Sequence, residues 1–186
     1  MNRAAYSIIE LLVVVAILLI LAAVAVGTAN GVLAEQRMNN AYNAVTNLIQ
    51  EARGNALASK DSQIAEYRIT IPQPLIANPN QPVTVVLSSV STSGAETQLE
   101  RIDLGNQGLD ILFYQDQQQQ ACNLTSRIMY QTQTGTPIFE CAVTAYTGNL
   151  NTKQIRIEIR ERNQQNPRQR LFTIHRASGT PQFATP

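Results

Sequence analysis

The chain has 186 residues, and its 14 lysines and arginines nearly balance its 13 aspartates and glutamates, which gives a formal net charge of +1. A nearly neutral chain offers no whole-molecule electrostatic attraction for a nucleic acid or an acidic partner. The length suits one globular domain of ordinary size. Two isolated cysteines and one histidine lack the spacing of metal ligands, so we expect no metal and no cofactor.

An almost unbroken apolar run dominates the N-terminal end of the chain. It occupies residues 7–26, SIIELLVVVAILLILAAVAV, and contains a single carboxylate, Glu10. As a helix rising about 1.5 Å per residue, this run would cross most of a hydrocarbon layer about 30 Å thick. An acidic side chain in such a segment is costly, which indicates a function that requires a partner charge. The short polar leader with Arg3 favours an N-terminus inside the cell.

Beyond residue 30 the apolar positions recur every three or four residues, which is typical of an amphipathic helix. They are Met38, Tyr42, Val45, Leu48, Ile49, Ala52 and Ala56. We therefore expect one long N-terminal helix, with a transmembrane first half at 6–30 and an amphipathic second half at 31–59. A secretory signal peptide is the alternative for the apolar run, although signal-peptide cores are shorter and lack an acid.

From residue 60 the helical period gives way to alternating apolar and polar residues, which is typical of β-strands. The most regular strands are expected at 66–71 and 153–161, where apolar side chains share one face. Further strands are expected at 83–90, 97–104, 109–115, 126–131, 138–146 and 171–176. Polar connections are expected at 72–82, 115–123 and 162–169. The predicted fold class is α+β, with the long helix packed on a mostly antiparallel β domain at 60–186.

The two cysteines, Cys122 and Cys141, would form a disulfide if the domain lies outside the cytoplasm, and two unpaired thiols are the alternative. A closed loop of this size contributes about 3 kcal/mol by the chain-entropy estimate. His175 is the only histidine, so any catalytic triad would need it. No nucleophile elbow or phosphate-binding loop accompanies it, and we therefore expect no enzymatic activity.

Basic residues are concentrated near the C-terminal end, where positions 151–186 hold seven of the fourteen lysines and arginines and only two acids. On the strand expected at 153–161, Arg156 and Arg160 lie opposite the isoleucine face. Arg162 shares their parity if the strand continues. These three guanidinium groups are candidates for binding DNA phosphates. The alternative is a solvated sheet face on which the arginines pair with a neighbouring glutamate.

The order of these parts resembles that of the type IV pilin and pseudopilin family. The resemblance is carried by residues 6–17, YSIIELLVVVAI, which resemble the family's prepilin cleavage and methylation motif. It implies that a prepilin peptidase cuts between Ala5 and Tyr6, which releases a leader of residues 1–5 and leaves a methylated amine at Tyr6. In filaments of this family that amine pairs with the motif glutamate of a neighbouring subunit, here Glu10. Ala5 departs from the glycine that usually precedes the cut.

The resemblance implies a structural subunit of a type IV pilus-like filament. The implied partners are copies of itself, other pilins, the prepilin peptidase, an inner-membrane assembly platform and an assembly ATPase. The implied location is a single pass through the cytoplasmic membrane before assembly and an extracellular or periplasmic filament afterwards. One alternative is a minor pilin or pseudopilin of a type II secretion or DNA-uptake filament, with its arginine-rich strands on DNA. Another is an exported domain for which the apolar run is only a membrane anchor.

Overall fold

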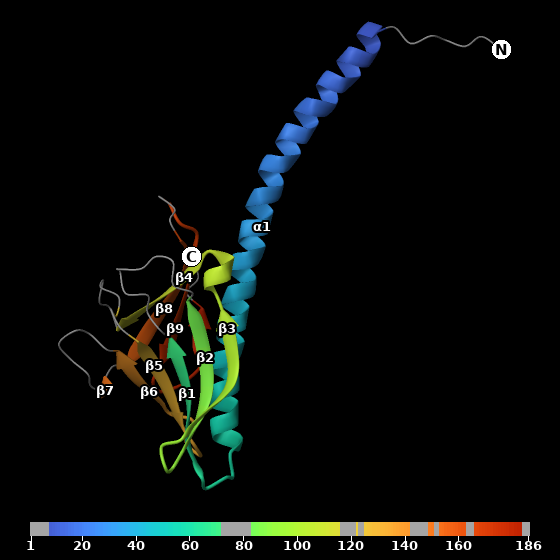
Figure 1. Cartoon of the computed structure of the whole chain (residues 1–186). Coiled ribbons are helices and arrows are strands. Elements are labelled where there is room, and N and C mark those ends of the chain that lie inside the picture. Colours follow the sequence, from blue (N-terminus) through green and yellow to red (C-terminus); the bar gives the residue numbers. More distant parts are fainter. Residues whose placement is uncertain are drawn as a thin grey trace. The chain divides into compact units, whose positions relative to one another are not determined.

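The computed structural model describes residues 8–71, 83–115, 122, 125–141, 149–150, 153–162 and 166–183. Within these residues it contains one long α-helix, one short 3₁₀ helix and ten strands (Figure 1). The chain divides into two units, Met1–Arg37 and Met38–Pro186. The division falls inside the expected amphipathic segment, 31–59, because buried helix side chains begin at Met38.

Helix α1 runs from Ile8 to Ala58. No proline interrupts it, and leucine and alanine, both strong helix formers, recur along its length. In the second unit the helix buries one stripe of apolar side chains, spaced three or four residues apart as an amphipathic helix requires. These buried residues are Met38, Ala41, Val45, Leu48, Ile49, Ala52 and Ala56.

The expectation that the first half of this helix is transmembrane is wrong. The side chains of α1 are described in two stretches, 8–23 and 31–58, which contain 16 and 28 residues. In the described part of the chain, no helix combines the length and the apolar character that crossing a membrane requires. The predicted fold class with its transmembrane half, and the single-pass membrane location, are corrected accordingly.

Six antiparallel strands form the first sheet, here called sheet A, in the order β3-β2-β1-β5-β6-β7. Its strands are β1 (Ile64–Ile71), β2 (Thr84–Ser91), β3 (Glu96–Asp103), β5 (Ser126–Gln131), β6 (Pro137–Cys141) and β7 (Asn149–Leu150). Because side chains alternate along a strand, Ile69 and Ile71 enter the core. Glu66 and Arg68 therefore lie on the opposite, outer face.

Four antiparallel strands form the second sheet, called sheet B, in the order β10-β9-β8-β4. Its strands are β4 (Leu109–Gln115), β8 (Gln154–Glu161), β9 (Gln169–His175) and β10 (Pro181–Phe183). The 3₁₀ helix η1 (Gly105–Gln107) connects sheet A to sheet B between β3 and β4. On β8, Ile155, Ile157 and Ile159 are fully buried, as their alternation predicted.

The second unit has one hydrophobic core that combines residues of α1, sheet A and sheet B. Tyr42 of α1 packs edge-on against Phe172 of β9, with ring centroids 5.5 Å apart. Tyr130 of β5 is fully buried, and its hydroxyl donates a hydrogen bond of 2.9 Å to the carbonyl of Gly179. The turn between β5 and β6 reaches the end of α1, where the Gln133 N–H donates to the Ala56 carbonyl at 2.9 Å.

The strands expected at 109–115 and 126–131 coincide with β4 and β5. Each of the other predicted strands begins within two residues of an observed strand. The strand predicted at 138–146 overlaps β6 at 138–141, and its last five positions lie outside the described residues. The expected connection at 72–82 also lies outside them. Strands β7 and β10 were not predicted, since two or three residues are too few to show a period.

One electrostatic contact joins the helix to the edge of sheet A. Burial, a hydrogen bond with Glu51 of α1 and the charge of Glu51 all raise the pKa of Glu100 on β3. A carboxyl pKa that is raised in the folded state stabilises the fold at acidic pH, and this contribution is lost as the pH rises through that pKa. At neutral pH the two carboxylates therefore destabilise the domain.

Glu100→Gln is expected to stabilise the protein by about 0.3 kcal/mol at pH 7, the size of an exposed charge interaction, because it removes the repulsion. The gain should disappear near pH 4, and urea unfolding followed by tyrosine fluorescence at both pH values measures it. Glu51→Gln should give the same gain, and the double variant little more, since either change removes the same pair. Equal gains at both pH values would contradict the prediction.

Candidate functional site

The first unit presents an apolar helix surface that the described residues leave uncovered. Successive residues of an α-helix point about 100° apart, so four consecutive residues sample the whole circumference. Leu11, Leu12, Val13 and Val14 are 62%, 61%, 53% and 52% exposed, respectively. The same holds for the other large apolar residues of this segment, which are Ile8, Ile9, Val15, Ile17, Leu18, Leu19, Ile20 and Leu21. A helix that is apolar all round is stable only where its whole circumference is covered.

Glu10 lies in the first turn of α1 and is exposed among these apolar side chains. The residues expected to accompany it, Ala5 at the cleavage point and Tyr6 with the new amine, lie outside the described residues. The pairing of Glu10 with the amine of another copy therefore stays a prediction.

Cys122 is buried and disulfide-bonded. Its backbone N–H also donates a hydrogen bond of 2.8 Å to the carbonyl of Phe113, which holds this position against strand β4 of sheet B. Cys141 ends strand β6 of sheet A, and its side chain lies outside the described part. The pairing of the two cysteines stays a prediction, and such a bond would link the two sheets.

The candidate DNA-binding arginines share the outer face of sheet B, but the structure gives two of them partners within the domain. The guanidinium of Arg156 lies 4.6 Å from the centre of the Tyr114 ring, a cation–π arrangement. Arg162 contacts the carboxylate of Asp110 at 2.7 Å, and both side chains are less than one fifth exposed. Arg160 lies on the same face, four residues from Arg156.

Glu158 lies between Arg156 and Arg160 on this face of β8 and is only 9% exposed. Burial and the neighbouring Glu158 raise the pKa of Tyr114, whose hydroxyl is hydrogen-bonded to that carboxylate. A buried carboxylate needs the nearby guanidinium groups to remain charged at low cost. This geometry favours a structural role for the arginines over contact with DNA phosphates.

His175, the only histidine of the chain, ends strand β9. Its side chain is half-buried, and its carbonyl accepts a hydrogen bond from the Gly179 N–H at 2.8 Å. Across the described ranges, no three His, Cys, Asp or Glu side chains are grouped so that they could hold a metal ion.

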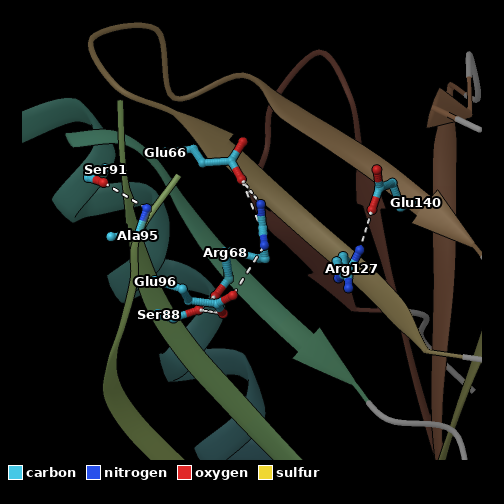
Figure 2. Close-up of polar contacts among 8 residues, drawn as sticks. All are labelled: Glu66, Arg68, Ser88, Ser91, Ala95, Glu96, Arg127 and Glu140. Atoms are coloured by element: carbon cyan, nitrogen blue, oxygen red, sulfur yellow. Dashed lines mark hydrogen bonds and ion pairs between the residues drawn. The ribbon is translucent and has the colours of Figure 1, made fainter. Parts of the chain in front are cut away.

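The structure also assembles a polar cluster on the outer face of sheet A that the sequence did not indicate (Figure 2). Arg68 of β1 lies between two carboxylates, 2.6 Å from Glu66 and 3.3 Å from Glu96. The hydroxyl of Ser88 donates to Glu96 from the neighbouring strand. The alternation of Glu66 and Arg68 was visible in the sequence, but Glu96 joins them only because β3 lies beside β2.

Comparison of the chain with protein-family models, with curated proteins and with solved structures finds no match. Function is therefore inferred from the residues and geometry of the chain itself.

Proposed function

We propose that the chain is a structural subunit of a type IV pilus-like filament that assembles through helix α1. The observation that carries this proposal is the exposure of large apolar side chains around the whole circumference of the helix at 8–21. Burying one such side chain contributes about 1.5–3 kcal/mol, so together they provide a strong driving force for association.

The distribution of these side chains supports a many-helix assembly over a dimer. A helix that pairs with one partner needs a single apolar stripe, as in a coiled coil. Here one partner would leave the other side of Leu11–Val14 exposed to water, whereas several surrounding copies cover every side. Copies of the same helix have the required chemistry, and the second unit, which has its own core, remains folded beside them.

Glu10 fixes how far neighbouring helices are shifted along one another in such a bundle. Covering the apolar surface removes water from this carboxylate, which then needs a positive partner. The resemblance of residues 6–17 to the prepilin motif supplies one, the Tyr6 amine of a neighbouring copy after removal of residues 1–5. The proposed partners are therefore further copies and other pilins, the prepilin peptidase, an assembly platform and an assembly ATPase.

Electron microscopy combined with mass spectrometry of the mature N-terminus tests the proposal. The expected result is filaments that contain the chain, beginning at a methylated Tyr6. Glu10→Gln should lower filament yield, because it removes the charge that pairs with the amine. A surface protein that retains Met1 or is cut far beyond Ala5, and that forms no filaments, would overturn the proposal.

A further inference from the structure

Strand β3 is the most exposed of the described strands. All of its residues at 96–101 are exposed, so both faces of the strand meet solvent there. It is also the terminal strand of sheet A, with a strand partner only on the side of β2. Leu99 at its centre is 49% exposed, and among the described residues it is the one large apolar side chain outside α1 that is exposed.

The other sheet edges in the described part offer much less room for a partner strand. Strands β7 and β10 have two and three residues. Strand β4 already accepts a hydrogen bond from the Cys122 N–H at the Phe113 carbonyl, on the side away from β8. An open strand edge can pair with a strand of another chain. Among the described edges of this protein, the one that equals β3 in length is β3 itself, in a second copy.

A β-bulge decides which side chains of β3 share a face. Ser88 of β2 is opposite Gln98 and Leu87 is opposite Glu100, so Leu99 is an extra residue on β3. The extra residue reverses the alternation beyond it. Glu96 and Arg101, five positions apart, consequently lie on the same outer face of sheet A, although an unbroken strand would place them on opposite faces.

The cross-strand neighbours support this assignment. Glu96 contacts Arg68, which lies on the outer face of β1. Arg101 is opposite Val86, and Val86 is in turn opposite Thr70, the neighbour of the buried Ile69. Alternation therefore places Thr70, and with it Arg101, on the face away from the core.

We propose that two copies of the chain pair through their β3 strands, antiparallel, with Glu96 of each copy opposite Arg101 of the other. In this register Thr97 is opposite Glu100 and Gln98 is opposite Leu99, so that no like charges face each other. Charged residues on an edge usually discourage pairing. Here the two charges have opposite signs, and a two-fold axis between the copies forms the Glu96–Arg101 pair twice, once on each side of the axis.

The charges select this register over its neighbours. A shift of two residues in one direction places Glu96 opposite Asp103, which is repulsive. A shift in the other direction leaves Arg101 beyond the end of the partner strand. Glu96 keeps 44% of its side chain exposed while it contacts Arg68, so it remains accessible to a second cation.

Zero-length carbodiimide cross-linking of the full chain carrying Arg101→Lys tests the pairing. Unlabelled and ¹⁵N-labelled copies are mixed, and the linked peptides are identified by mass spectrometry. Within one copy, positions 96 and 101 are about 16 Å apart along the strand, too far for a direct amide bond. A link between Glu96 and the new lysine therefore joins two copies, and we expect linked peptides that contain one labelled and one unlabelled half. Their abundance should be several-fold higher than that of peptides linking Glu96 to Lys60 or Lys153.

Two control variants make the result specific. Glu96→Gln in the same background should remove the link, and Ala177→Lys, an equally exposed position on the turn after β9, should give no link to Glu96. The link should persist when Ile17 and Leu21 of α1 are replaced by glutamine, and its loss there would assign the contact to helix packing. Absence of an isotope-mixed link, or equal links from Ala177→Lys, would overturn the proposal.

Discussion

Replacing both Ile17 and Leu21 with glutamine is expected to abolish filament formation while leaving the second unit folded. The two residues are four apart, so they lie on one face of α1, and they are 51% and 60% exposed in the single chain. In a bundle each contributes about 1.5–3 kcal/mol of burial, and glutamine would instead bring an amide that lacks a partner. Because every subunit carries both changes, the loss repeats at each contact along the polymer.

Negative-stain electron microscopy and pelleting by ultracentrifugation measure the loss, and circular dichroism reports whether the strands of the second unit remain folded. Leu99→Gln is the matched control, since it also replaces an exposed leucine but lies on β3 instead of α1. It should leave filament yield at the wild-type level. Filaments of normal abundance from the double variant would refute assembly through α1.

Tyr130→Ala is expected to destabilise the second unit by about 3–5 kcal/mol, the usual cost of removing a buried aromatic side chain. Tyr130 is fully buried in the core that α1 and the sheets share. Tyr130→Phe keeps the ring and removes only the hydroxyl. It is expected to lower the free energy of unfolding by about 1–2 kcal/mol, because the carbonyl of Gly179 loses its donor. Urea unfolding of both variants measures the two contributions.

The matched control is Tyr67→Phe, which removes a hydroxyl from the residue directly opposite Tyr130 on β1 and should cost little. Burial raises the pKa of Tyr130 above its ordinary value. An acid with a raised pKa in the folded state stabilises the fold below its unfolded pKa, and the contribution is lost as the pH rises above about 10. Tyr130→Phe should therefore lessen the loss of stability at alkaline pH, whereas an unchanged alkaline profile would contradict the burial of this hydroxyl.

The sequence predicted most strands because short runs rich in apolar and aromatic residues are bounded by turn residues, and in two of them, 66–71 and 153–161, the residues alternate. The segments 109–115 and 126–131 were placed correctly at both ends, since polar or glycine-containing turns flank a short apolar run in each. The amphipathic stripe of α1 was likewise visible from its spacing, and the residues predicted from it to be apolar contacts are in the core, with Tyr42 partly buried. Local periodicity thus specifies which elements form and which face each one buries.

The order of the strands could not be read in the same way, because it depends on contacts between residues far apart in the chain. Asp110 and Arg162 form a close ion pair only because β4 and β8 are neighbours in sheet B. The carboxylates Glu51 and Glu100 meet only because β3 forms the edge of sheet A nearest this part of α1. The transmembrane prediction was wrong, because no helix in the described part of the chain is both long enough and apolar enough to cross a membrane.

The end of helix α1 has a consequence for the order in which the protein forms. The N–H of Gln133 donates to the carbonyl of Ala56, and Gln133 adopts a positive φ of 69°, which is uncommon for a residue with a side chain. A ribosome releases Ala56 long before the β5–β6 turn that completes this contact. During synthesis the Ala56 carbonyl therefore lacks this donor until that hairpin emerges, and a non-local contact of this kind slows folding.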